Sequence, residues 1–351
     1  MPRLKLADIP LTDIEQWLFA RLSPEHLESA RGLYELMPLQ RDGQLPFVDV
    51  PYDAYSEAHW AEAARIADYV AHLPAGGAHI LDIGPGDGWP ALPIAAAVPD
   101  TEVIGVDPSP RRVHVSTANA QRLHLPNARF VLADGGRLPF GNATFDLVTA
   151  ASSIEEAADA VAVLYEAARV LRPGGVLRAS YQDWRLDIPE FETLLLWEGA
   201  ETLLYTYIRR IQEPPIERRY TLVLPHEGEA AKRHTDALVQ AAAGRRAYGE
   251  TLLTPALGIP MIEALTPHVQ RCTLVEMRRW DTATLAEALR AAGFSQVRTT
   301  VHPGELGRRF ARHVLAWQSM PAFAPLFAEA TRALGSLAGS QTGDAMVAAV
   351  R

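Results

Sequence analysis

Three observations predict a doubly wound α/β sheet that is interrupted by an insertion. Short β-branched runs alternate with helical stretches from Ala78 onward, the pattern of parallel strands joined by crossover helices. The first run leads into a glycine-rich turn, GPGDG, at 84–88. The strand pattern stops after Asp183 and returns only near Thr284.

Composition sets broad limits on function. The 351 residues allow one large domain or two ordinary ones, and 48% hydrophobic with 21% charged residues is typical of a globular chain. A formal charge of −9 disfavours nucleic acid and anionic membrane as partners. The single cysteine, Cys272, excludes an intramolecular disulfide framework and a multi-cysteine metal site. With neither a signal peptide nor a run of about 18 apolar residues, the expected location is the cytoplasm.

The first half of the chain is predicted to form an N-terminal helical cover over 1–75, followed by the start of the sheet. Helical spacing is clearest at 55–73, where Pro74 and Gly76 end the helix. Ser109 and Pro110 have the cap and first-turn positions of a further helix. Five strands are expected at 79–83, 102–106, 129–132, 145–150 and 176–181.

The second half is predicted to form an insertion and then the rest of the sheet. The segment 186–280 is expected to be a mainly helical cap over the ligand-binding edge, because apolar residues at 191–212 recur with helical spacing. It also contains a short run at 220–224 and a polar helix near 229–243. A helix at 284–292 with capping-box spacing, a helical stretch near 311–337, and strands at 296–302 and 345–350 complete the chain. The sheet core therefore comprises 76–185 and 281–351.

The glycine-rich turn argues against a nicotinamide cofactor. Gly84, Gly86 and Gly88 let a ligand approach the backbone, but the sixth place counted from Gly84 holds Trp89 instead of the glycine that dinucleotide sites require. Asp82 comes two residues before the first glycine, and a carboxylate there suits an ammonium group better than a pyrophosphate.

Two further acids end the next strands. Asp107 closes the second strand, where a carboxylate can accept hydrogen bonds from both ribose hydroxyls, and Asp134 closes the third. Ligands bind at the carboxyl ends of the strands in open α/β sheets. The three acids together therefore indicate a ligand with a cationic group, a ribose and an adenine; the alternative is that each is an ordinary strand-end cap.

At these motifs the chain resembles the class I S-adenosylmethionine-dependent methyltransferases, and most closely their small-molecule, type-11-like branch, which includes quinone-biosynthesis C-methyltransferases. The resemblance runs over 80–181 and again over 284–351. It rests on ILDIGPGDG, GVDPS, LADGGRLPF, FDLVTA and LYEAARVLRPGG.

The resemblance implies a Rossmann-like seven-stranded sheet of order 3-2-1-4-5-7-6 with its last strand antiparallel. It also implies S-adenosyl-L-methionine as cofactor and S-adenosyl-L-homocysteine as product. Asp82 would contact the methionine part, Asp107 the ribose and Asp134 the adenine. The other cofactor-binding positions in the matching segments are Gly84, Pro85, Gly86, Gly88, Pro108, Gly135 and Ala151.

Candidates for catalysis lie after the fourth strand. Where the family's small-molecule members often carry histidines, this chain has Glu155 and Glu156; either could accept a proton from an acceptor hydroxyl or amine, or both could be first-turn helix acids favoured by the dipole. His59 is a second candidate base, with a surface histidine as the alternative. The predicted acceptor-pocket aromatics, which could equally be core residues, are Tyr52, Tyr55, Tyr181 and Trp184. His302 and an arginine group at 308, 309 and 312 are weaker candidates.

The sequence therefore predicts methyl transfer to oxygen, nitrogen or carbon of a small molecule by in-line displacement, with no metal. The segment after the fourth strand lacks the Asn-Pro-Pro-Tyr pattern of enzymes that methylate bases. Three alternatives stay open: aminopropyl transfer on the same fold, a cofactor-binding protein without turnover, and a nicotinamide-dependent reductase. A homodimer formed through the insertion is a further expectation.

Overall fold

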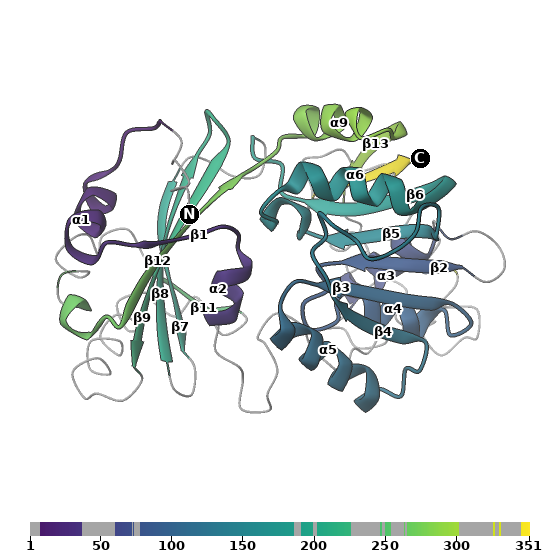
Figure 1. Cartoon of the computed structure of the whole chain (residues 1–351), viewed down its shortest axis with the longest axis horizontal. Coiled ribbons are helices and arrows are strands. Elements are labelled where there is room, and N and C mark those ends of the chain that lie inside the picture. The colour runs from purple at the N-terminus through teal and green to yellow at the C-terminus, as the bar shows by residue number, and fades with distance from the viewer. Residues whose placement is uncertain are drawn as a thin grey trace. The chain divides into compact units, whose positions relative to one another are not determined.

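The chain forms two compact units in the computed structural model. One comprises 1–47 and 189–279, and the other 48–188 and 280–351; we call them the β unit and the core unit (Figure 1). The structure describes residues 8–36, 60–71, 73, 78–185, 191–198, 202–225, 246–247, 250–253, 263, 265–301, 326, 330 and 345–351.

The core unit contains a seven-stranded sheet of the expected topology. Its order is β4-β3-β2-β5-β6-β14-β13, which in chain order of these strands reads 3-2-1-4-5-7-6. β14 is antiparallel to both its neighbours, and the other pairs are parallel. The strands are β2 (His79–Ile83), β3 (Glu102–Asp107), β4 (Ala128–Leu132), β5 (Phe145–Ala151), β6 (Leu171–Tyr181), β13 (Ser295–Val301) and β14 (Ala345–Val350).

Helices cover both faces of this sheet. One apolar cluster packs α6 (Ala160–Val170) and α9 (Thr282–Ala291) against it, and another packs α3 (Trp60–Val70) and α4 (Ala91–Ala97). α5 (Pro110–Arg122) begins as predicted, with the Ser109 side chain accepting a hydrogen bond from Arg112 N. α9 begins two residues before the predicted start at 284, because Asp281 is the N-cap and forms the capping box with Thr284.

The β unit differs from the prediction. The helix expected over 191–212 is wrong: β7 (Phe191–Glu198) and β8 (Thr202–Ile211) occupy it as antiparallel strands. The run at 220–224 lies within β9 (Ile216–Pro225). With β1 (Glu25–Leu27), β10 (Arg246–Ala247), β11 (Glu250–Leu253) and β12 (Arg271–Arg278), they form a second sheet of order β1-β12-β9-β8-β7-β11-β10. The described part of the insertion is therefore a β-sheet and not a helical cap; the helices expected near 229–243 and 311–337 lie outside the described residues.

Two helices cover the two faces of the second sheet, which explains why the sequence of β7 and β8 resembled that of a helix. α1 (Asp13–Leu22) packs on one face of the second sheet, where Leu18 belongs to the same cluster as Tyr205 and Leu222. α2 (Arg31–Leu36) packs on the other face, where Leu33 meets Trp197. Strands buried on both faces lose the alternation of apolar and polar residues that identifies a half-buried strand. The N-terminal segment expected to cover the core thus belongs, through residue 47, to the β unit.

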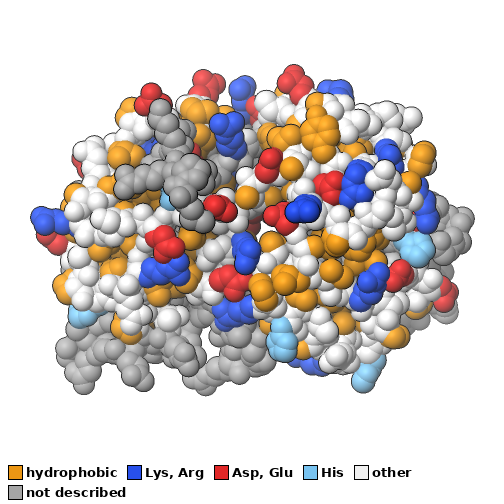
Figure 2. Space-filling view, in the orientation of Figure 1, with side chains coloured by type: hydrophobic (Ala, Val, Ile, Leu, Met, Phe, Trp, Pro, Cys, Tyr) orange, Lys and Arg blue, Asp and Glu red, His pale blue; other side chains and the backbone are white. Residues whose placement is uncertain are grey.

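The visible surface mixes charges of both signs. In Figure 2, acidic and basic side chains lie interspersed among apolar ones over the described residues on this face. None of the helices that the structure describes is long and apolar enough to cross a bilayer.

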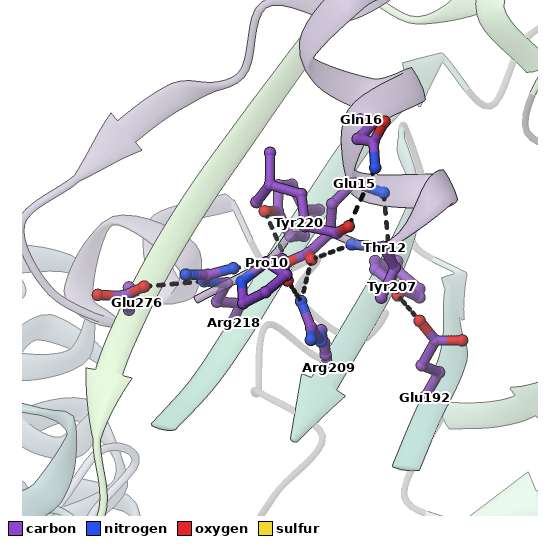
Figure 3. A network of polar contacts seen from close by, with 11 residues as sticks. Pro10, Thr12, Glu15, Gln16, Glu192, Tyr207, Arg209, Arg218, Tyr220 and Glu276 are labelled. Carbon is purple, nitrogen blue, oxygen red and sulfur yellow. Dashed lines mark hydrogen bonds and ion pairs between the residues drawn. The ribbon is translucent and has the colours of Figure 1, made fainter. Parts of the chain in front are cut away.

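One buried carboxylate attaches α1 to the second sheet (Figure 3). Glu15 completes a capping box with Thr12 at the start of α1, and its side chain is fully buried. It accepts hydrogen bonds from Tyr220 Oη at 2.9 Å and Arg218 Nη1 at 3.3 Å, and forms an ion pair with Arg209. The start of the helix is thereby bound to β8 and β9.

Candidate functional site

The glycine-rich turn follows β2 and requires glycine at three positions. Gly84, Gly86 and Gly88 have φ angles of +73°, +55° and +119°, in the range that other residues rarely adopt. A Cβ atom on Gly86 would lie 2.3 Å from Nη1 of Arg112. The turn is held to the neighbouring strand by a 2.8 Å hydrogen bond from Gly84 N to Val106 O.

Asp82 is fully buried at the end of β2. Its Oδ2 accepts a 3.0 Å hydrogen bond from Ala91 N, and its Oδ1 accepts one of 2.9 Å from the Thr149 hydroxyl. Burial, together with the negative charge of Asp107, raises the pKa of Asp82 to about 8, although the two hydrogen bonds oppose the shift. Among the described residues no basic side chain forms an ion pair with Asp82, so the site suits a cationic ligand.

Asp107 ends the adjacent strand, β3, and is 6% exposed. Its carboxylate accepts hydrogen bonds from Gly86 N at 3.2 Å and Ser109 N at 2.9 Å. It therefore joins the glycine-rich turn to the start of α5, with Pro108 in the connecting loop. The prediction that Asp82, Asp107 and the glycines lie at one sheet edge agrees with this geometry.

Asp134 lies in the turn after β4 and is exposed. Its Oδ1 accepts a 2.8 Å hydrogen bond from Gly136 N. The next residue, Gly135, is buried against β2, since a Cβ atom there would lie 3.0 Å from Cγ2 of Ile83. The turn after the third strand therefore reaches the same edge of the sheet.

The end of β5 contacts the glycine-rich turn. Ala151, half-buried, is the last residue of β5 and precedes Ser152, whose φ of +51° is unusual for serine. The Ser153 hydroxyl donates a hydrogen bond to Ile83 O at 2.5 Å. A Cβ atom added to Gly84 would lie 2.6 Å from the Cβ atom of Ser153. These contacts fix the segment that leads to the predicted catalytic acids.

Glu155 and Glu156 lie in a 3₁₀ turn, η2 (Ile154–Glu156). The Glu155 side chain is 5% exposed and accepts a 3.4 Å hydrogen bond from Gln182 N. It therefore lies where the ends of β5 and β6 meet. Glu156 is half-buried.

Tyr181 and Trp184 are buried where the chain leaves and re-enters the core unit. The Tyr181 hydroxyl lies 2.7 Å from Oγ1 of Thr282, and Trp184 N donates to Trp280 O at 3.1 Å. The Trp184 side chain is 0% exposed. Both residues therefore contact the segment 280–282, where the chain re-enters the core unit. The remaining sequence candidates lie outside the described residues: Tyr52, Tyr55, His59, His302, Arg308, Arg309 and Arg312.

Three residues at this edge of the sheet were not predicted from the sequence: Thr149, Tyr69 and Arg112. Thr149 is the register partner of Asp82 across β5 and β2, and a polar residue within the apolar run FDLVTA was the available signal. Arg112 lies over Gly86. Tyr69, on α3, carried no signal, because it fits the apolar stripe of a helix.

The described residues suit a nucleoside ligand that carries a positive charge, because two buried carboxylates and a glycine-rich turn meet at adjacent strand ends. They include no group of three or more histidine, cysteine or acidic side chains arranged to hold a metal ion.

Comparison with known proteins agrees with this chemistry. Residues 80–175 match a family model described as a methyltransferase domain. Demethylmenaquinone methyltransferase from Deinococcus radiodurans is 36% identical over 118 residues, 34% of this chain and 47% of that protein. The 27-O-demethylrifamycin SV methyltransferase from Amycolatopsis mediterranei is 39% identical over 102 residues, 29% of this chain and 37% of that protein.

The matches cover half or less of the length of these curated relatives. A solved S-adenosylmethionine-dependent methyltransferase from Clostridium acetobutylicum aligns with 84% of this chain and 92% of its own, at 12% identity and a TM-score of 0.49. On these sequence matches, residues 80–175 form a methyltransferase domain similar to those of S-adenosylmethionine-dependent methyltransferases.

Proposed function

We propose that the protein transfers a methyl group from S-adenosyl-L-methionine to a small-molecule acceptor by in-line displacement and forms S-adenosyl-L-homocysteine. The observation that carries this proposal is the meeting of buried Asp82 and Asp107 with the glycine-rich turn at adjacent strand ends. The cofactor supplies an electrophilic methyl group on a positively charged sulfur. Asp82 would hold its methionine part, Asp107 its ribose, and the turn containing Asp134 its adenine.

Relatives support a small organic acceptor. Those named above act on a demethylated rifamycin and a demethylated menaquinone according to their names, and an O-methyltransferase from Penicillium expansum is 36% identical over 105 residues, 30% of this chain and 38% of that protein. The interspersed surface charges seen in Figure 2 offer no broad basic track for a polyanion on that face. A hydroxylated small molecule is the acceptor class we favour.

Glu155 is the residue we propose as the acceptor-side base. A hydroxyl acceptor must lose its proton as the methyl group arrives, and a buried carboxylate can accept it. Glu155 is more buried than Glu156 and lies between the ends of β5 and β6. Positioning of the acceptor would supply most of the remaining rate enhancement.

The test is a turnover assay with the full chain. Purified protein is incubated with S-adenosyl-L-methionine and panels of phenols, hydroquinones, amines and carboxylic acids, and products are identified by mass. We expect a methylated product together with an equal amount of S-adenosyl-L-homocysteine. Binding without turnover across all panels would favour a binding protein. Product formation only from the decarboxylated cofactor and a polyamine would favour aminopropyl transfer.

A further inference from the structure

Three buried polar side chains form a row across the core sheet. Asp82 of β2 pairs in register with Thr149 of β5, which pairs with Arg178 of β6. Their exposed fractions are 0%, 0% and 2%. The row lies on the face covered by α3, because Arg178 Nε donates to Asp68 Oδ2 of that helix at 2.7 Å.

The charges at the two ends of this row are balanced differently. Arg178 is neutralised by Asp68 and donates a second hydrogen bond of 2.9 Å to Oγ1 of Thr300. Among the residues that the structure describes, Asp82 accepts hydrogen bonds only from two neutral groups, the Thr149 hydroxyl and the Ala91 amide. An ionised carboxylate in such a place is costly unless a cation accompanies it.

The groups that face Asp82 from neighbouring elements do not supply that cation. Asp107 of β3 adds a negative charge. Tyr69 of α3 is fully buried, and burial, opposed by the charge of Arg65 and reinforced by that of Asp82, raises the pKa of Tyr69 to about 12. This phenol stays neutral near pH 7, and its hydroxyl has no hydrogen-bond partner among the described residues. Beyond it, the charge of Arg178 is already paired with Asp68.

We propose that Asp82 holds a proton in the cofactor-free protein and releases it to solvent when the ammonium group of the cofactor binds. Cofactor affinity then depends on pH through this one carboxyl group. The inference rests on the assignment of the cofactor and adds a proton to its binding equilibrium. The raised pKa of Asp82, about 8, agrees with a neutral carboxyl group in the free protein near pH 7. A bound cation lowers the pKa of a neighbouring carboxyl group.

The experiment is calorimetric titration with S-adenosyl-L-homocysteine, which carries the ammonium group and is not consumed. Titrations near pH 7 in buffers of different ionisation enthalpy count the protons released. We expect close to one proton per bound ligand. We also expect the association constant to rise about tenfold per pH unit between about pH 6 and 7.5, and to level off near pH 8.

Two variants isolate the carboxyl group. Asp82→Asn keeps the shape of the side chain and removes its titration. Any protons that this variant releases on binding come from the ligand. The additional protons released by the wild type are therefore those of Asp82. Thr149→Val removes a hydrogen bond that favours the ionised carboxylate of Asp82, so the pH at which affinity levels off should move upward. Thr149→Ser keeps the hydroxyl and should return this pH to the wild-type value. A purely structural role for Thr149 would lower affinity equally at every pH.

The outcomes separate this inference from the cofactor assignment. Equal proton counts for wild type and Asp82→Asn, with both binding, would overturn proton release and leave the cofactor assignment intact. If Asp82→Asn does not bind, an unchanged pH profile in Thr149→Val overturns the inference instead. Absence of binding by the wild type at every pH between about 6 and 9 would overturn the cofactor assignment and the inference with it.

Discussion

Gly86 combines a left-handed backbone with a very close neighbour. Its φ is +55°, and a Cβ atom would lie 2.3 Å from Arg112 Nη1. Gly174 is a matched control, since its φ is +81° but a Cβ atom there would meet nothing within 4 Å. We expect both alanine variants to lose about 1–2 kcal/mol of stability from the backbone conformation. Only Gly86→Ala should also lose cofactor affinity, about tenfold or more; equal affinities by calorimetry would contradict this.

Asp107 connects β3 to the glycine-rich turn, and we propose that its carboxylate binds the ribose of the cofactor. Asp107→Ala should weaken cofactor binding by about 1–3 kcal/mol, the loss expected for hydrogen bonds to a charged group. Glu102→Ala is the control, because Glu102 begins the same strand and forms an ion pair with Arg129 while 40% exposed. Calorimetry should show normal affinity for the control; a normal affinity for Asp107→Ala would remove its proposed ribose role.

Glu155 is expected to affect the rate and not the binding of cofactor. Glu155→Gln should lower kcat by about 10²- to 10⁴-fold if it is the general base. The association constant for S-adenosyl-L-homocysteine should be unchanged. Glu156→Gln, one residue away and half-buried, should retain most activity. A large loss in Glu156→Gln with a normal rate in Glu155→Gln would reverse the two roles.

At the residue scale, the sequence could predict which residues share a sheet edge wherever local order defines their position. Asp82 and the glycines follow one another around the end of β2, and Asp107 ends the next strand, so their common edge could be predicted. Thr149 and Tyr69 could not, because their proximity to Asp82 depends on strand register and on the packing of α3. The roles of Glu155 and Glu156 depend likewise on which side chain the 3₁₀ turn buries.

At the scale of elements, α1 depends on one carboxylate. Glu15→Gln removes the negative charge that Arg209 and Arg218 share in a buried site, and breaking such a pair costs about 3–5 kcal/mol. Hydrogen–deuterium exchange should therefore accelerate in β8 and β9 and stay unchanged in β3 and β4 of the core unit.

The control for α1 is an exposed pair in the same unit. Glu25 and Arg271 form an ion pair with side chains 55% and 43% exposed, and such pairs contribute about 0–1 kcal/mol. Glu25→Gln should leave exchange in β8 and β9 unchanged. Equal hydrogen–deuterium exchange of β8 and β9 in Glu15→Gln and Glu25→Gln would show that the charge of Glu15 does not hold α1 on the second sheet.

The elements of the core unit were predictable and those of the β unit were not, for a physical reason. Parallel strands and their crossover helices alternate along the chain, so each boundary has a local signal such as Ser109 before α5. In β7 and β8 both faces are covered, and leucines recur at spacings that fit a helix as well as a strand. These segments form strands because β7 pairs with β11 and β8 pairs with β9, and the local sequence does not encode this pairing.

At the scale of the whole molecule, the buried carboxyl group of Asp82 is expected to lower stability when it ionises. The pKa of Asp82 is raised in the folded state, from 3.8 to about 8, so between these values the folded protein binds more protons than the unfolded chain. Stability conferred by the neutral carboxyl group is therefore complete below about pH 4 and is lost as pH rises toward 8. Each unit of difference in pKa corresponds to about 1.4 kcal/mol, so the loss amounts to several kcal/mol.

Asp82→Asn should consequently stabilise the cofactor-free protein, and increasingly so as the pH rises. We expect its Tm to match that of the wild type near or below pH 4 and to exceed it clearly near pH 8, because the amide needs no counter-ion. Saturating S-adenosyl-L-homocysteine should narrow this difference by supplying a cation to the wild-type carboxylate. Asp146→Asn, which loses the 2.7 Å ion pair with Arg172, should lower Tm and serves as the control. Parallel Tm curves for wild type and Asp82→Asn from about pH 5 to 9 would contradict a destabilising charge at Asp82.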